Sequence, residues 1–210
     1  MDRRQAVARI ESQLAESCRV KQRFSNALKA RIAELAERMA ATLAGGGTIY
    51  WIGNGGSAAD AQHLAGELGA RLSRDRRPFS SVALTTNSSI LTSIPNDDSY
   101  EQVFARQIEA LLREADLLVA LSTSGNSRSV LRGTAAANAR GAFTVGWTGK
   151  SGGELKKIVQ LCLCVPSRDT QRIQESHITI GHIVCGLVED LLAPRRSFAQ
   201  PAKKPAAFAS

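Results

Sequence analysis

His63 and Glu67 are two residues whose types and spacing could hold a metal ion. They are four positions apart, so on a helix they lie on one face about one turn apart and can both reach one cation. An imidazole together with a carboxylate suits zinc. Taken alone, this spacing more often belongs to a surface histidine with a glutamate nearby, so further ligands are needed before it predicts metal chemistry.

Further candidate ligands recur along a helical pattern near the C-terminus, which contains Gln174, His177 and His182. On a regular helix, Gln174 and His182 are separated by ~12 Å of rise and ~80° of rotation. This spacing permits both side chains to converge on one metal along one helix, and it equally permits ligands to come from two subunits. His177 is the histidine for which we expect a structural role.

A loop rich in hydroxyl groups, residues 122–127, indicates a second kind of chemistry. Ser122, Thr123, Ser124 and Ser127 place four hydroxyls in six residues, directly before a helical pattern that begins near Arg128. Hydroxyls and free backbone N–H groups at a helix N-terminus bind phosphate without a lysine, because the helix dipole adds positive potential there. The alternative is a simple Ser or Thr helix cap, which needs only one of these hydroxyls.

A glycine-rich loop, residues 53–57, reads Gly-Asn-Gly-Gly-Ser and lies between an apolar segment and a helical pattern. Its glycines let the backbone approach a ligand closely. The loop is not a dinucleotide-binding fingerprint, because Ala58 stands where GxGxxG requires glycine. Gly149-Lys150-Ser151 resembles the end of a P-loop, but Thr144 stands where the first glycine is required. Nucleotide binding is therefore disfavoured.

The elements that must position these loops are short apolar segments that alternate with helical patterns. The predicted strands cover residues 48–52, 81–84, 115–121, 142–147 and 160–165, and the helical patterns include 57–72, 100–113, 127–140 and 171–192. This alternation predicts an α/β fold, a single three-layer α/β/α domain with a five-stranded parallel sheet. Ligands of such a sheet bind at the carboxyl ends of its strands, where both loops are expected.

Three regions are predicted along the chain. Residues 1–44 carry apolar positions at helical spacing and form a helical N-terminal arm that ends at three consecutive glycines. Residues 45–193 form the α/β domain. Residues 194–210 contain four basic residues, no acidic residue and three of the six prolines, a composition typical of a disordered basic tail.

Composition and charge exclude several classes of protein. The chain is 43% hydrophobic and 22% charged, as in ordinary globular proteins. Its apolar runs fall far short of the ~20 residues of a membrane span, and its start lacks the apolar core of a secretory signal, so we expect a cytoplasmic protein without membrane contact. The net charge is +8, but neither the tail nor the cluster Arg71, Arg74, Arg76 and Arg77 is interleaved with stacking aromatics, which disfavours nucleic-acid binding.

In their order and spacing, these motifs resemble the phosphoheptose isomerases, bacterial sedoheptulose 7-phosphate isomerases of the sugar isomerase (SIS) fold. The resemblance runs from about Lys21 to Leu192. The segments that carry it are residues 53–68, Asn96-Asp97, residues 122–127, Thr148-Gly149, and residues 172–175 followed by 181–183.

The resemblance implies one zinc ion per subunit, held by His63, Glu67, Gln174 and His182. It places the catalytic pair on Glu67 and His182. The implied sugar-phosphate contacts are Asn54, Gly55, Gly56, Ser57, Glu67, Asn96, Asp97, Ser122, Thr123, Ser124, Ser127 and Gln174. The family is usually a homotetramer with active sites shared between subunits, which would suit a helical N-terminal arm.

The implied reaction converts sedoheptulose 7-phosphate to D-glycero-D-manno-heptose 7-phosphate, the first step of ADP- or GDP-heptose biosynthesis. Moving a proton between C1 and C2 through an enediol requires a carboxylate base, a partner for the oxygen protons and charge stabilisation at the oxygens. The resemblance assigns the base at carbon to Glu67 and the proton exchange at oxygen to His182. Zinc would polarise the carbonyl as a Lewis acid.

Two alternatives use the same motifs. A non-catalytic SIS module, resembling the protein that associates with the replication initiator DnaA, shares both loops, but its pattern lacks the glutamate and the second histidine, which this chain has as Glu67 and His182. An isomerase of another sugar phosphate would keep the same catalytic residues, because the chain length of the sugar is selected by pocket shape.

Overall fold

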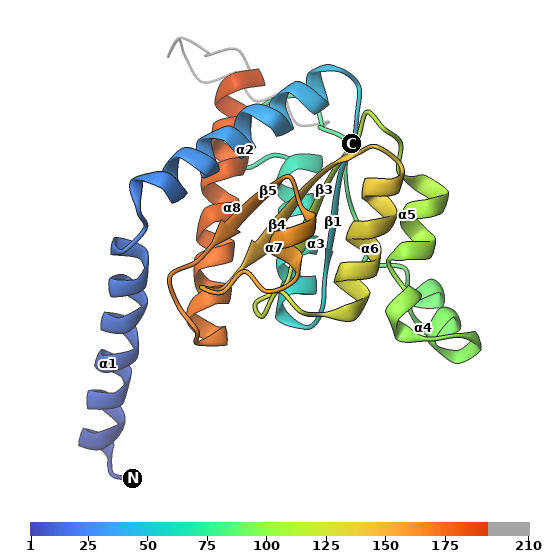
Figure 1. The fold of residues 1–210 in the computed structure, drawn as a ribbon. Coiled ribbons are helices and arrows are strands. Elements are labelled where there is room, and N and C mark those ends of the chain that lie inside the picture. The colour runs from blue at the N-terminus through green and yellow to red at the C-terminus, as the bar shows by residue number, and fades with distance from the viewer. Residues whose placement is uncertain (193–210) are drawn as a thin grey trace, which may run out of the picture.

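Five parallel strands form one sheet in the computed structural model, which describes residues 1–192 (Figure 1). The expected basic tail, 194–210, lies outside the described residues. The strands are β1 (Ile49–Gly53), β2 (Ser81–Ala83), β3 (Leu117–Leu121), β4 (Phe143–Thr148) and β5 (Leu161–Cys164), in the spatial order β2-β1-β3-β4-β5. Every pairing is parallel, which confirms the sheet expected from the alternating pattern.

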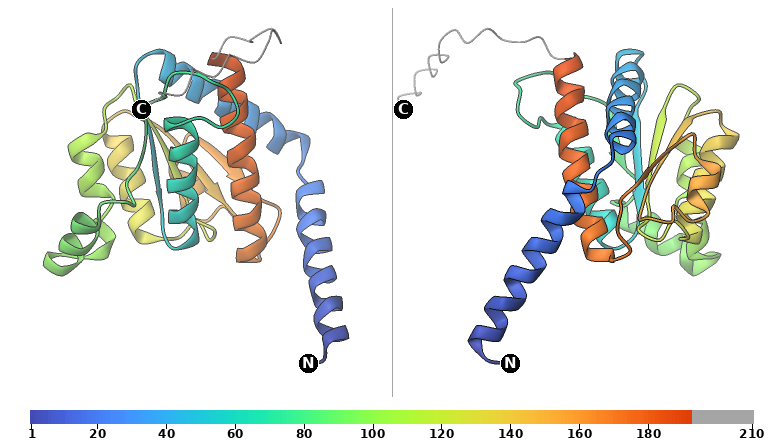
Figure 2. Two further views of the ribbon diagram at one scale, coloured as in Figure 1. Left: turned by 180° about the vertical axis from the view of Figure 1, so that it is seen from behind. Right: turned by 60° about the vertical axis from the view of Figure 1, so that its left-hand side comes forward.

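Helices cover both faces of this sheet, as the two views of Figure 2 show. One face carries α2 (Asn26–Ala44), α3 (Gly56–Gly69) and α8 (Thr170–Leu192). The other face carries α5 (Ala105–Leu111), α6 (Arg128–Ala139) and α7 (Leu155–Ile158), with the 3-10 turn η1 (Tyr100–Gln102) beside them. The predicted three-layer α/β/α architecture is therefore confirmed.

The two central strands, β1 and β3, are apolar because both of their faces are buried. On β1, Ile49 and Trp51 enter the core beneath α2, α3 and α8, whereas Tyr50 and Ile52 enter the core beneath α5 and α6. Successive side chains of a strand point to opposite faces, so an apolar residue is needed at every position. This is the reason that the strands read as continuous apolar runs rather than as alternating ones.

The two helices of the segment 1–44 have different environments. In α2, Ser25 caps the first turn by accepting a hydrogen bond from the Leu28 amide, and the apolar face of the helix is buried in the core of the sheet. In contrast, α1 (Arg3–Gln22) projects from the domain (Figure 2). Its apolar residues Val7, Ile10 and Leu14 are 48%, 57% and 64% exposed. Within this chain, the projecting arm is therefore α1 alone.

A helix that the sequence pattern did not predict, α4 (Ser88–Asp97), precedes η1. It begins at Asn87, whose side chain accepts a hydrogen bond from the Ile90 amide, and it contains Pro95 in its last turn. None of its residues is buried. A short helix that has no buried apolar face and contains a proline shows no helical spacing of apolar residues. The capping residue is then the main feature of the sequence that indicates it.

No helix within residues 1–192 is both long enough and apolar enough to cross a membrane.

His177 has the structural role expected for it. The imidazole is fully buried, its ring centroid lies 5.9 Å from that of Trp147, and its Nε2 lies 3.3 Å from the carbonyl oxygen of Thr148. Burial lowers the pKa of His177 from 6.5 to about 4, against the opposing effect of the Thr148 hydrogen bond. The folded protein therefore holds this histidine neutral.

We expect this neutral histidine to make the fold sensitive to acid. Because the folded pKa lies below the unfolded one, the unfolded chain takes up a proton first as the pH falls below 6.5, and stability is lost until the pH reaches about 4. The contribution of His177 should decrease by about 2 kcal/mol between pH 7.5 and pH 5. Urea titrations of the protein and of His177→Gln at both pH values measure this difference.

The comparison with the variant is needed because Asp60 acts in the opposite direction. Burial raises the pKa of Asp60 to about 6, so its protonation stabilises the folded state as the pH falls. Asp60 contributes equally to both proteins and cancels in the difference. An identical loss of stability in the protein and in His177→Gln would contradict the assignment to His177.

Candidate active site

The two loops singled out in the sequence begin side by side at the centre of the sheet. Strands β1 and β3 are neighbours, and Gly53 at the end of β1 pairs with Leu121 at the end of β3. The chain moves outward from β1 to β2 in one direction and from β3 to β4 in the other, so this is the point at which the strand order reverses. Open α/β sheets bind their ligands at such a point.

A chain of hydrogen bonds joins these loops through Asn54. Its Nδ2 donates to the hydroxyl oxygens of Ser127 at 2.8 Å and Ser129 at 3.0 Å, and its Oδ1 accepts a hydrogen bond from the Tyr100 hydroxyl at 2.8 Å. The Asn54 side chain therefore holds the glycine loop, the hydroxyl loop and η1 in one arrangement.

Both loops lead into helix N-termini that lack a side-chain cap. Gly55 precedes α3 and has no side chain to offer, and Ser127 precedes α6 but makes no capping hydrogen bond to it. The Ser127 hydroxyl accepts from Asn54 instead, which argues against the simple-cap alternative. Two helix N-termini without side-chain caps then face the same end of the sheet, an arrangement that favours a phosphate.

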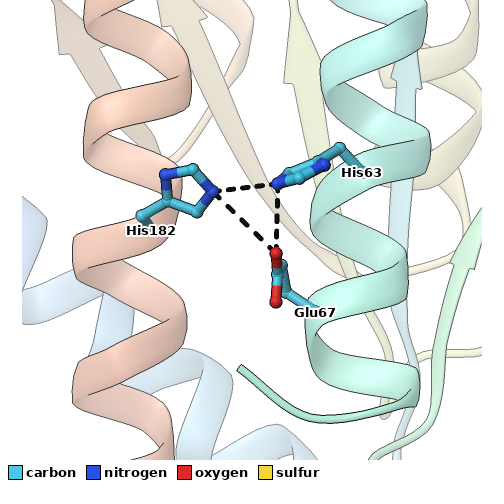
Figure 3. A group of neighbouring side chains, drawn as sticks. All are labelled: His63, Glu67 and His182. Carbon is cyan, nitrogen blue, oxygen red and sulfur yellow. Dashed lines mark hydrogen bonds and ion pairs between the residues drawn. The ribbon is translucent and has the colours of Figure 1, made fainter. Parts of the chain in front are cut away.

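His63, Glu67 and His182 converge at the surface between α3 and α8 (Figure 3). His63 Nε2 lies 2.9 Å from His182 Nε2 and 3.1 Å from Glu67 Oε1, and His182 Nε2 lies 3.9 Å from the same carboxylate oxygen. His182 thus joins His63 and Glu67 within one chain.

The three ligand atoms of this triad, His63, Glu67 and His182, fit a metal ion. Bonds of about 2.0–2.1 Å in tetrahedral geometry place ligand atoms about 3.3 Å apart, and the distances of 2.9, 3.1 and 3.9 Å bracket that value. Two imidazole nitrogens and a carboxylate oxygen that point to one place are all acceptors when deprotonated, so a cation satisfies them together. The donor set of nitrogen and oxygen atoms is compatible with a divalent metal.

Gln174 lies at the other end of α3 from the triad. A Cβ atom on Gly56 would stand 2.6 Å from Gln174 Nε2, so glycine at position 56 allows α8 to approach the first turn of α3. Gly56 and His63 are seven residues apart, about 10 Å along the helix. Within one chain, the Gln174 amide is therefore beside the glycine loop rather than beside the two imidazoles.

Asn96 and Asp97 form the C-terminal end of α4 and are exposed. Asn96 Nδ2 donates to Asp97 Oδ1 at 2.8 Å. Among the hydrogen bonds of residues 1–192, none joins this pair to the triad or to either loop. The remaining candidates lie in the loops as expected, with Ser57 and Ser122 buried, Thr123 half-buried and Ser124 exposed.

Three residues at the site were missed by the sequence analysis. Tyr100 and Ser129 both bond to Asn54, and Asp60 has a buried Oδ2 atom without a hydrogen-bond partner in the described chain. Asp60 stands three positions before His63, a spacing that places both on one face of α3 and could have drawn attention to it. Tyr100 had no comparable signal, because its contact with Asn54 is made only in the folded chain.

The arginine cluster that raised the question of nucleic acid is largely engaged in ion pairs. Arg71 contacts Asp75 at 3.8 Å, Arg76 contacts Glu189 at 2.8 Å, and Arg74 pairs with Asp190. Arginines that pair with carboxylates of the same protein leave little charge for phosphates of a nucleic acid. Three of the four arginines of this cluster are therefore paired within the chain.

Comparisons with known proteins identify the family of this chain. The sequence profile of the SIS domain matches residues 14–149. A phosphoheptose isomerase from Geobacter sulfurreducens is 51% identical over 185 residues, which is 88% of this chain and 98% of the relative.

Two solved structures are similar as well. The phosphoheptose isomerase GmhA from Neisseria gonorrhoeae has a TM-score of 0.83 at 39% identity, covering 88% of this chain and 99% of that one. A phosphoheptose isomerase from Francisella tularensis has a TM-score of 0.85 at 32% identity, covering 88% and 98%. With its fold, its two loops and its His-Glu-His triad, the chain belongs to the SIS domain family and, within it, to the phosphoheptose isomerases.

Proposed function

We propose that this enzyme converts sedoheptulose 7-phosphate to D-glycero-D-manno-heptose 7-phosphate by proton transfer through an enediol, with zinc as its metal. The observation that carries the proposal is the convergence of His63, Glu67 and His182, about 10 Å along α3 from its uncapped N-terminus. The names of the relatives support the choice of a heptose phosphate as substrate. We further propose that the enzyme acts in the cytoplasm as a homotetramer, with the exposed apolar residues of α1 buried between subunits.

The phosphate is bound by the two loops at the centre of the sheet. The N-termini of α3 and α6 supply backbone N–H groups and the positive ends of two helix dipoles. Hydroxyls of Ser57, Ser122, Thr123 and Ser124 supply further donors. No lysine is required for this recognition, and the bound phosphate directs the carbonyl end of the sugar toward the triad.

Glu67 moves the proton between the two carbon atoms. Its contacts with both imidazoles use Oε1, which leaves Oε2 for the proton at carbon. With Oε1 directed at the metal and Oε2 at the carbon-bound proton, one carboxylate can serve both as a metal ligand and as a base. His182 exchanges the proton at oxygen, and positioned groups of this kind typically accelerate proton transfer by ~10²–10⁴-fold.

The zinc ion, when bound, polarises the substrate carbonyl and stabilises negative charge at its oxygen. His63, Glu67 and His182 would hold it, one ion per subunit. Gln174 was expected as a fourth ligand, but its place beside Gly56 favours a role at the phosphate end of the site in its own chain. Coordination by Gln174 requires a movement of its side chain or a ligand contributed across a subunit boundary. Asn96 and Asp97, exposed at the end of α4, would contact the sugar.

Conversion of the substrate by the purified protein tests the proposal. We expect NMR to show D-glycero-D-manno-heptose 7-phosphate appearing from sedoheptulose 7-phosphate. Ketose phosphates of five and six carbons serve as controls and should react more slowly. Faster conversion of one of these controls would show that the pocket selects another sugar. Binding of the heptose phosphate without turnover of any of them would instead favour the non-catalytic module.

Loss of one hydroxyl at Tyr100 should weaken substrate binding. Tyr100→Phe removes the hydrogen bond to Asn54 Oδ1, so the glycine loop is held less firmly. A neutral hydrogen bond contributes about 0.5–1.5 kcal/mol net, which corresponds to an increase in KM of roughly 2- to 13-fold with little change in kcat.

The chain offers a matched control for this experiment, since it has only two tyrosines. The hydroxyl of Tyr50 donates to the Leu111 carbonyl at 3.4 Å, and Tyr50 lies near the amino end of β1, away from both loops. Tyr50→Phe should leave KM unchanged. Equal KM values for the two variants would contradict the role assigned to Tyr100.

A further inference from the structure

A buried ion pair joins the segment that follows α3 to α8, on the C-terminal side of Glu67 and His182. Arg76 Nε donates to Glu189 Oε1 at 2.8 Å, and the two side chains are 3% and 0% exposed. Glu189 also accepts hydrogen bonds from the backbone amides of Leu72, Ser73 and Arg74 and from the Ser73 hydroxyl, at 2.9–3.1 Å. Although burial alone would raise the pKa of Glu189, these bonds hold it at about 2.

The guanidinium of Arg76 also binds the backbone of α3 itself. It donates to the carbonyl oxygens of Glu67 and Leu68, both at 2.9 Å. The last four carbonyls of a helix have no partner within the helix, and a cation near them is favourable. Arg76 thus fixes the last turn of α3, and it does so at the peptide carbonyl of the same residue whose carboxylate faces the two imidazoles.

Glu189 stands on the same face of α8 as His182. They are seven residues apart, about 10 Å of rise and within about 20° of rotation on a regular helix. A Cβ on Gly181 would stand 2.4 Å from Leu64 Cδ2, so the two helices touch closely one residue before His182. The helices therefore touch just before His182, at Leu64 and Gly181, and are joined beyond it through Arg76 and Glu189. Glu67 and His182 lie between these two contacts.

We propose that Arg76 and Glu189 are positioning residues that set Glu67 against His182 across the α3–α8 contact. Neither touches the reacting atoms. Arg76 acts through the Glu67 carbonyl, and Glu189 anchors Arg76 and the 72–74 backbone to α8. This inference rests on the proposed function insofar as the triad is taken as the metal site, but the contacts themselves do not depend on the metal.

Two variants of the pair and one milder variant test this role. Arg76→Lys keeps the positive charge but loses the planar guanidinium group, which donates to Glu189 and to the carbonyls of Glu67 and Leu68 at the same time. Glu189→Gln keeps the shape and removes the charge. Breaking a buried ion pair destabilises the fold, so these two variants could fail to fold. Ser73→Ala is expected to fold, because it removes only one hydrogen bond to Glu189. Leu112→Ala is the control for lost stability, because Leu112 is fully buried in the core on the opposite face of the sheet.

The first readout is the affinity of the metal-free protein for Zn²⁺, measured by competition with a chromogenic chelator. Changes in residues that orient metal ligands typically weaken binding by about 10- to 100-fold. We expect a loss of about tenfold or more for Arg76→Lys and Glu189→Gln, a smaller loss for Ser73→Ala, and an unchanged affinity for folded Leu112→Ala.

The second readout needs neither metal nor substrate. The chain has only three histidines, so labelling with ¹⁵N-histidine gives three imidazole spectra, of which His177 is an internal control on α8. We expect the signals of His63 and His182 to shift in the three Arg76, Glu189 and Ser73 variants and that of His177 to stay. Unchanged signals with unchanged zinc affinity, or equal changes in Leu112→Ala, would overturn the inference. If the unmodified protein binds no zinc, the metal proposal fails, and the histidine spectra still decide on Arg76 and Glu189.

Discussion

Replacing Glu67 with Gln is expected to lower kcat for sedoheptulose 7-phosphate by ~10²–10⁴-fold, the usual contribution of a positioned general base. The amide has the same shape as the carboxylate but cannot accept the proton from carbon. It also replaces a charged oxygen that faces His63 at 3.1 Å and His182 at 3.9 Å, so zinc binding should weaken as well. Steady-state kinetics by NMR, with zinc added to saturation, separate the first effect from the second.

The controls for Glu67→Gln address its folding and the specificity of the substitution. The side chain of Glu67 is 19% exposed and is not part of the apolar core, so the variant should keep the oligomeric state and thermal stability of the unmodified protein. Glu37→Gln, at an exposed position of α2, should retain full activity. Loss of assembly in Glu67→Gln would identify Glu67 as a structural residue, and retention of kcat at saturating zinc would remove it as the base.

Removing the metal is expected to have the second largest effect. Electrostatic stabilisation at a developing oxyanion contributes on the order of 3 kcal/mol, or roughly 10²-fold in kcat. Treatment with a chelator should therefore lower turnover by about this factor, and added zinc should restore it. Binding of the sugar phosphate should persist, because the proposed phosphate contacts come from the N-termini of α3 and α6, and Gly56 lies about 10 Å from His63 along α3.

His63→Ala makes the same test without a chelator. His63 belongs to the triad but is not assigned a proton transfer, so this variant should lose metal affinity and turnover while its Kd for the sugar phosphate changes little. Zinc at concentrations that restore the stripped protein should not restore the variant. Full turnover by protein shown to be free of metal would exclude zinc from the mechanism.

Much of the fold could be predicted from the sequence because the relevant signals are local. The apolar residues of β1 and β3 follow directly from burial on both faces of a parallel sheet, and the glycine and hydroxyl loops lie at strand ends that any such sheet brings together. Helix α4 could not be predicted, because nothing along Ser88–Asp97 is buried. The spacing of apolar residues in 1–44 predicted helices. It did not distinguish α2, which is buried in the core, from α1, which projects from the domain.

In the candidate site, too, local features could be predicted from the sequence and contacts between distant elements could not. The α/β class, the two loops and the pairing of His63 with Glu67 could be predicted from the sequence, because each depends on residues within one element or at one strand end. The resemblance named His182 as a ligand, but the spacing left open whether it acts in the same chain. The folded structure brings His182, 119 positions after His63, to His63 and Glu67 within one chain. It also places Gln174 beside Gly56 and Arg76 against Glu189. Spacing along a helix determines the face on which a side chain lies, whereas packing of one helix against another determines what that face meets.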